Sequence, residues 1–195
     1  QIAALQYAKA GKLMDDKQTE EGTLAYLEAA KQFEDYLEKY TDPRRDEDEV
    51  SQIMKLTAQS YEFGGNTAEA NRVNKRFVGL YPYRDDSRAL LFQIATNYMN
   101  SLDYENAIRY YKTLYRETYG KGKPYADAKT AYKNIAILNI GKGDFKGAAK
   151  GFEDYATKFR DDADAEAIFF MAGEQWLKHN NYNALEFYNR YLKKY

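Results

Sequence analysis

Residues 91–119 read LFQIATNYMNSLDYENAIRYYKTLYRETY, a stretch in which two helix patterns follow one another. Small or apolar residues recur at positions i, i+4 and i+7 within 91–98 and again within 107–114, so each set lies on one face of an α-helix. Residues 101–103 between them are Ser-Leu-Asp, a short polar turn whose aspartate is a favoured helix cap. The stretch therefore predicts a helix, a tight turn and a second helix.

The second helix of this pair has counterparts throughout the chain. Each copy is an alanine followed by a second residue, usually aromatic, four positions later and by a large residue after three more. The five copies are Ala29-Phe33-Tyr36, Ala70-Asn74-Phe77, Ala107-Tyr111-Leu114, Ala148-Phe152-Tyr155 and Ala184-Tyr188-Tyr191. Their alanines are 41, 37, 41 and 36 residues apart. Repetition at such an interval predicts an array of similar helix pairs.

A second small residue marks the first helix of four of the five pairs. Ala58, Ala95, Ala136 and Ala172 each lie twelve residues before one of the alanines of the second helices. Small side chains allow two helix backbones to approach at the short end of the usual range of roughly 8–10 Å. The intervening turns, which supply glycine, asparagine or aspartate, are residues 64–66, 101–103, 141–144 and 180–181.

These features resemble the tetratricopeptide repeat. The resemblance rests on the paired small residues, on the aromatic residue after the second alanine, and on the turns Leu102-Asp103-Tyr104 and Gly143-Asp144-Phe145. Leu80-Tyr81-Pro82 ends one copy with a proline, as repeats of this family often do. The resemblance implies an all-α fold, a right-handed α–α superhelix of about five helix pairs.

The resemblance covers essentially the whole chain and implies one solenoid over residues 1–195. Its repeats are expected at about 1–42, 47–82, 85–119, 125–160 and 163–195. The sequence begins at Gln1, without methionine and inside a helical pattern, which is typical of a piece of a longer protein.

A narrower resemblance concerns the setting. The Tyr-Pro pair at 81–82, the run Asp-Tyr-Glu-Asn-Ala at 103–107 and the Tyr-Tyr pair at 110–111 are similar to bacterial envelope repeat proteins. These include the outer-membrane assembly lipoprotein and the coordinator of the Tol–Pal system. The resemblance implies a periplasmic or outer-membrane-associated protein, with the cytoplasm as the alternative.

The composition argues against several classes of function. The net charge is −1, from 29 basic and 30 acidic residues, which gives no basic field for nucleic acid. The sequence contains no run of 18 apolar residues, the length needed to span a bilayer. The chain has no cysteine and a single histidine, so neither a thiolate metal site nor a zinc site is expected.

Catalytic and cofactor sites are not expected either. His179 lies at the end of a predicted helix, where a partial positive charge is favourable. Acidic runs at 46–49 and 161–166 precede predicted helices, where carboxylates cap the first turn. The sequence therefore predicts no catalytic residue, no cofactor and no metal.

If the geometry of the family holds, the spacing from the alanines of the first helices identifies the residues that face the groove. They are Lys55, Gln59, Phe92, Gln93, Thr96, Asn100, Lys133, Asn134, Phe169 and Trp176. Amides, lysines and aromatic side chains suit an extended peptide, whose backbone needs hydrogen bonds and whose side chains need pockets. Trp176, the only tryptophan, is expected either in the core or as an anchor for a ligand.

The function predicted from this pattern is a non-catalytic scaffold or adaptor that binds a protein or peptide through its groove or its ends. Self-association through the helix that ends at residues 191–195 is a further possibility. An alternative is an accessory domain that positions a polymer such as a glycan for an enzyme. A third interpretation is a peptide or small-ligand sensor in the cytoplasm.

Overall fold

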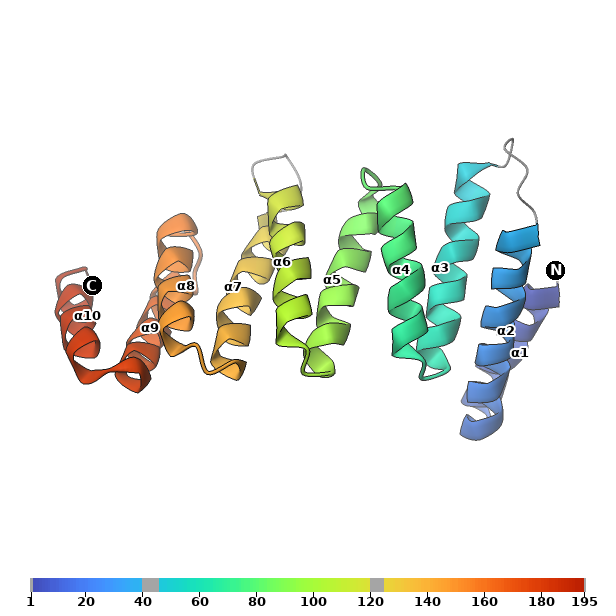
Figure 1. Cartoon of the computed structure of the whole chain (residues 1–195), viewed down its shortest axis with the longest axis horizontal. Coiled ribbons are helices and arrows are strands. Elements are labelled where there is room, and N and C mark those ends of the chain that lie inside the picture. Colours follow the sequence, from blue (N-terminus) through green and yellow to red (C-terminus); the bar gives the residue numbers. More distant parts are fainter. Residues whose placement is uncertain (1, 40–45, 120–124, 195) are drawn as a thin grey trace. The chain divides into compact units, whose positions relative to one another are not determined.

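The fold is all-α, as predicted. The structure is a computed structural model that describes residues 2–39, 46–119 and 125–194, and all the secondary structure in these residues is helical (Figure 1). The helices are α1 (Ile2–Asp15), α2 (Thr19–Lys39), α3 (Glu47–Phe63), α4 (Thr67–Leu80), α5 (Asp85–Asn100), α6 (Tyr104–Thr118), α7 (Tyr125–Gly141), α8 (Phe145–Lys158), α9 (Ala165–His179) and α10 (Asn181–Lys194).

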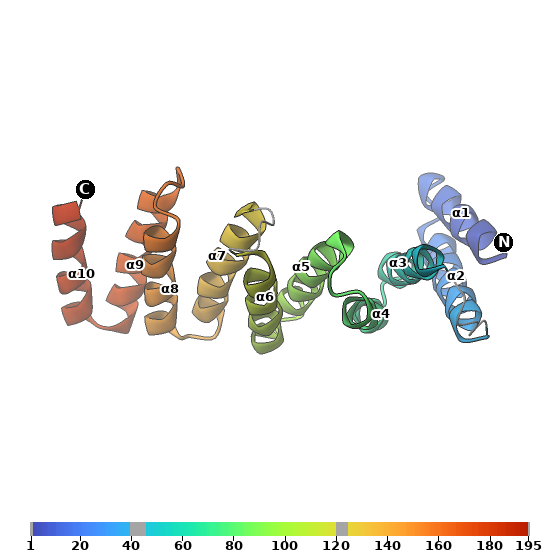
Figure 2. The ribbon, with the colours of Figure 1, turned by 90° about the horizontal axis from the view of Figure 1, so that it is seen from above.

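The chain divides into two compact units, residues 1–90 and 91–195, and the division falls inside α5. In the first unit α1 packs on α2, α2 on α3 and α3 on α4 (Figure 2). Met54, Tyr61, Val73 and Phe77 form much of the core between α3 and α4. Neighbours in sequence are thus neighbours in space, as in a repeat protein.

The second unit follows the same rule. Here α6 packs on α7, α7 on α8, α8 on α9, and α9 on α10. A continuous core joins α7, α8, α9 and α10 and includes Phe152, Phe159, Ile168 and Phe187, which are all buried. Each helix pair leaves an apolar side that the next pair covers, so stacking completes the core.

The predicted alanines lie where helices meet. The alanines of the first helices and of the second helices are at most 3% exposed: Ala29, Ala58, Ala70, Ala95, Ala107, Ala136, Ala148, Ala172 and Ala184. A glycine adds to one of these contacts, because a Cβ placed on Gly151 would lie 2.9 Å from the Cβ of Ala136. The close approach of α7 and α8 therefore depends on two small residues, and the prediction for the alanines is confirmed.

The turns within the first four helix pairs share one backbone geometry. Lys17, Gly65, Leu102 and Gly143 all have φ between 62° and 75°, the left-handed conformation that ends many helices. Each is followed by a residue whose N–H donates back to a carbonyl five residues earlier, as in Asp103 to Tyr98 and Asp144 to Asn139, both 2.9 Å. This closure satisfies carbonyls that the helix end leaves free.

The next helix starts at once in three of these turns. The side chains of Asn66, Asp103 and Asp144 accept a hydrogen bond from the backbone N–H three residues later. The turn between α9 and α10 shares this cap, because Asn180 Oδ1 accepts from the Asn183 N–H at 2.8 Å, but it has no left-handed residue. There α9 continues to His179 and Asn180 is extended, with φ −167° and ψ 152°. The fifth pair therefore has the predicted spacing of its alanines but a different connection.

Candidate protein-binding surface

Phe92 and Thr96 on α5 lie over one buried residue of α6, Tyr111. The Phe92 ring meets the Tyr111 ring edge to face at 5.7 Å, and the Thr96 hydroxyl lies 3.1 Å from the Tyr111 hydroxyl. Phe92 is 37% exposed and Thr96 is partly exposed, whereas Tyr111 is fully buried. Two of the predicted groove residues thus pack on Tyr111 and are partly accessible to solvent.

The other predicted residues on α5 and α7 are also accessible. Asn100 is exposed, and Gln93, Lys133 and Asn134 are partly exposed. All of them belong to the second unit, together with Phe92 and Thr96. Two successive first helices in one unit therefore present an aromatic ring, amides, a hydroxyl and an ammonium group, and it stays a prediction that these groups face a binding groove.

The last repeat corrects the prediction for two residues. Phe169 and Trp176 on α9 are only 5% and 6% exposed and belong to the core. Phe169 packs on Phe187 of α10 at 4.8 Å between ring centroids. The Trp176 indole N–H donates to Glu153 of α8 at 2.5 Å. The core alternative for Trp176 holds, and Phe169 cannot present its ring to a partner.

Phe170 takes the exposed position instead. It is 44% exposed and contacts Tyr188 and Tyr191 at its edges. Phe170 lies two residues before Ala172, as Gln93 lies before Ala95 and Asn134 before Ala136, so the same spacing could have identified it. The altered connection after α9 carries a sequence signal, since its turn is Asn180-Asn181 without the glycine or the aspartate of the other turns.

Lys55 and Gln59 on α3 lie in the first unit. Lys55 pairs with Asp86 at 3.0 Å, so its ammonium group is partly satisfied within the chain. Gln59 is exposed. These two residues therefore form a separate set from those on α5 and α7.

Comparison with solved structures identifies the fold. A tetratricopeptide repeat protein from Parabacteroides merdae superposes with a TM-score of 0.56 and 12% identity, over 98% of this chain and 66% of the other. BtubC from P. vanneervenii gives 0.58 and 16%, over 94% and 76%. MamA gives 0.54 and 13%, over 98% and 91%. The chain has the tetratricopeptide repeat fold. No protein-family model matches the sequence, and no curated protein does.

In two places, a glutamate on the second helix of one pair bonds to both helices of the next pair. Glu34 of α2 accepts from the Tyr61 hydroxyl of α3 at 2.5 Å and pairs with Arg72 of α4. Burial of the hydroxyl, and then its bond to Glu34, raise the pKa of Tyr61. The bonds to Glu34 and Glu69 raise the pKa of Arg72 as well. One carboxylate thus holds three helices together.

Glu153 plays the same part in the second unit. It lies five residues after Ala148, as Glu34 lies five residues after Ala29. It accepts from Trp176 of α9 and from both terminal nitrogens of Arg190 of α10, at 2.7 and 3.1 Å. A partly buried bidentate pair of this kind orders side chains more strongly than an exposed one.

A feature that sequence reasoning missed lies on α6. A shallow furrow of about 440 Å³ is lined by Glu105, Ile108, Arg109, Lys112, Thr113 and Arg116, all of this helix. Three of these six side chains are cations. Their spacing of three or four residues places them on one exposed face of the helix. A scan of the first helices alone could not find them, because α6 is a second helix.

Polar groups near helix ends have structural roles. Asp46 caps α3 through the Asp48 N–H at 2.9 Å, and His179 is the last residue of α9. Asp162 accepts from Tyr155 at 3.1 Å and pairs with Lys129 at 2.6 Å. Within the part of the chain that the structure describes, no three His, Cys, Asp or Glu residues gather as a metal site. No described helix is long and apolar enough to cross a membrane.

Proposed function

We propose that this chain is a non-catalytic scaffold or adaptor that binds a protein or peptide partner. The observation that carries the proposal is the accessible set on α5 and α7, namely Phe92, Gln93, Thr96, Asn100, Lys133 and Asn134. Repeat proteins of this fold class present extended surfaces built from equivalent positions of successive repeats. Amides and hydroxyls there can bond a peptide backbone, and Phe92 offers an aromatic anchor.

The arrangement also limits the entropy lost on binding. Phe92 rests on the buried Tyr111 ring, and Thr96 faces the hydroxyl of the same tyrosine. Side chains that are already held in place lose less freedom when a partner arrives. The partner is therefore expected to contact α5 through the part of the Phe92 ring that stays open.

We propose a complex of the bacterial envelope as the setting, in the periplasm or at the outer membrane. The support is the sequence resemblance of residues 81–82, 103–107 and 110–111 to envelope repeat proteins. Binding through the ends of the array, including self-association, belongs to the same proposal.

Site-specific crosslinking in native cells tests the binding surface. A photoreactive phenylalanine analogue at Lys133 is compared with the same analogue at Tyr83, which is 93% exposed and lies on the other unit. A discrete protein adduct at 133 that is absent at 83, and is lost with Phe92→Ala, supports the proposal. Equal adducts at both positions, or capture of glycan in place of protein, would contradict it.

A further inference from the structure

The two positions that form an ion pair between α2 and α4 are both lysines in α6 and α8. Glu34, five residues after the alanine of α2, pairs with Arg72, two residues after the alanine of α4. The same two positions at the later junction are Lys112 on α6 and Lys150 on α8. In the arrangement of α2 and α4, two like charges at these positions would repel each other and could not link the helices.

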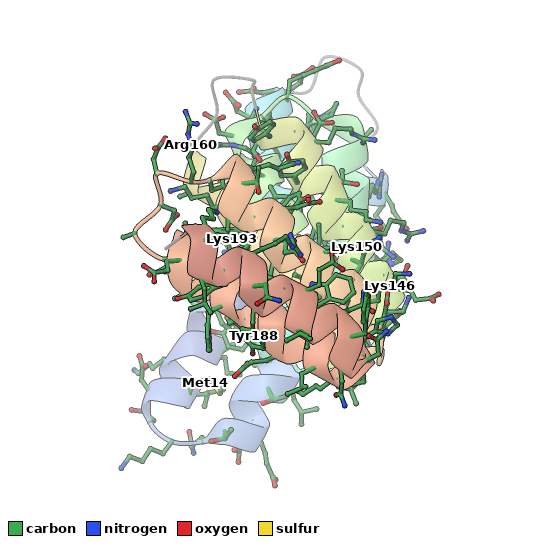
Figure 3. All side chains as sticks on the ribbon, turned by 90° about the vertical axis from the view of Figure 1, so that its left-hand side faces the viewer. Met14, Lys146, Lys150, Arg160, Tyr188 and Lys193 are labelled. Carbon is green, nitrogen blue, oxygen red and sulfur yellow. The ribbon has the colours of Figure 1, made fainter. Side chains whose placement is uncertain are left out.

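Neither lysine is neutralised from within. Both are exposed, and neither has an ion-pair partner among residues 2–39, 46–119 and 125–194. Lys146 lies one turn before Lys150 on the same side of α8 (Figure 3). Nearby carboxylates have other partners: Glu153 binds Trp176 and Arg190, and Asp154 accepts from Tyr132 at 3.3 Å. The cations are therefore available to an outside anion.

The furrow on α6 extends this charge along one face. Arg109 and Arg116 flank Lys112 there, with Ile108 and Thr113 beside them. Glu105, the one acidic residue in the lining, is paired with Lys142 at 3.2 Å. Among the residues that the structure describes, Arg116 pairs only with Glu117, through an exposed contact of 3.2 Å. Guanidinium and ammonium groups bind carboxylates, and the aliphatic side chain and the hydroxyl beside them can contact the rest of a polypeptide.

We infer that α6 and α8 form a second binding site, which takes an acidic protein segment bearing several Asp or Glu side chains. This inference rests on the proposed scaffold function and names the chemistry of one partner segment. It places that segment on the second helices, away from the predicted residues of the first helices. The patch is short and the chain has a net charge of −1, which favours a brief acidic peptide over a nucleic-acid backbone.

Fluorescence anisotropy with a labelled oligoglutamate peptide tests the site directly. The full chain is expected to bind the peptide, and Lys112→Ala/Lys150→Ala should weaken binding roughly tenfold. The matched control Lys12→Ala/Lys193→Ala removes two cations from exposed sites elsewhere and should leave affinity unchanged. Equal loss in both variants, or tighter binding of an oligonucleotide of the same charge, would overturn the inference.

Lys112→Glu tests whether position 112 lies opposite Lys150, as Glu34 lies opposite Arg72, separately from a general effect of charge. The new carboxylate would face Lys150 as Glu34 faces Arg72, so the unfolding midpoint should rise by about 2–4 °C while peptide binding is lost. A lower unfolding midpoint would show that position 112 does not lie opposite Lys150. If the peptide fails to bind but the crosslink from position 133 persists, this site is wrong and the scaffold proposal stands.

Discussion

At the scale of single residues, the turns show how the chain tolerates an unfavourable conformation. Gly65 and Gly143 occupy the left-handed position at no steric cost, but Lys17 and Leu102 occupy it with side chains. Leu102 is 69% exposed, so its side chain gains little from burial. Its backbone strain is therefore offset by the rest of the turn.

Exchanging residues between these turns should change stability in opposite directions. We expect Leu102→Gly to stabilise the chain by about 0.5–1 kcal/mol, because relief of left-handed strain exceeds the added freedom of the unfolded chain. Gly143→Ala should destabilise it by about 1 kcal/mol for the converse reason. No atom lies within 4 Å of the added Cβ at Gly143, so packing does not contribute. Urea unfolding measures both, and a loss of stability in Leu102→Gly would contradict the explanation.

Asp162 makes stability depend on pH. The hydrogen bond from Lys129 first, then those from the Asp164 N–H and Tyr155, lower the pKa of Asp162 in the folded state. A lowered folded pKa adds stability above the ordinary aspartate pKa of about 3.9 and loses it as pH falls through the folded value. Asp162→Asn should therefore reduce stability at pH 7 and lose less than the parent below about pH 4. Parallel thermal melts at pH 7 and pH 3 measure this, and identical pH profiles would refute it.

At the scale of helices, the small residues determine which pairs can approach. The sequence predicted these contacts because an alanine or glycine at a fixed interval has a direct steric meaning. It left out Phe170, although this residue lies two positions before Ala172, as Gln93 lies before Ala95, and the same spacing would have found it. It also did not predict the furrow on α6, since the predicted residues were chosen from the first helices and the furrow is lined by a second helix alone.

Adding one methyl group at two glycines should distinguish a helix contact from helix propensity. Gly151→Ala places a Cβ 2.9 Å from Ala136 and should cost about 1–3 kcal/mol by forcing α7 and α8 apart. Gly79→Ala lies near the end of α4 with no atom within 4 Å, and should stabilise by up to about 0.5 kcal/mol. Chemical denaturation of both variants provides the measurement. Equal effects would mean that α7 and α8 can separate without cost.

At the scale of the whole molecule, stability is distributed over neighbouring contacts rather than held in one core. Buried residues are numerous in α8, which packs between α7 and α9. The buried residues of α10 are Ala184 and Phe187 alone, and its one strong packing partner is α9. In a structure built from nearest neighbours, a helix with one neighbour opens more easily.

Amide hydrogen exchange should reveal this gradient. We expect amides in α10 to exchange at least about tenfold faster than those in the middle of α8, because α10 can open without disturbing α8. The variant Arg190→Ala should widen the difference, since it removes both hydrogen bonds that join α10 to Glu153. Uniform protection across both helices would show that the unit opens only as a whole.

The ion pairs of Glu34 and Glu153 bear on how such an array could be rearranged by recombination. A gene fusion that placed the α3–α4 pair directly after α6 would set Arg72 against Lys112, and it would separate Glu34 from both of its partners. Shape alone would permit the fusion, because the alanines match. Charge would oppose it, so these repeats are not interchangeable modules, and their order is constrained by side chains that lie outside the repeat pattern.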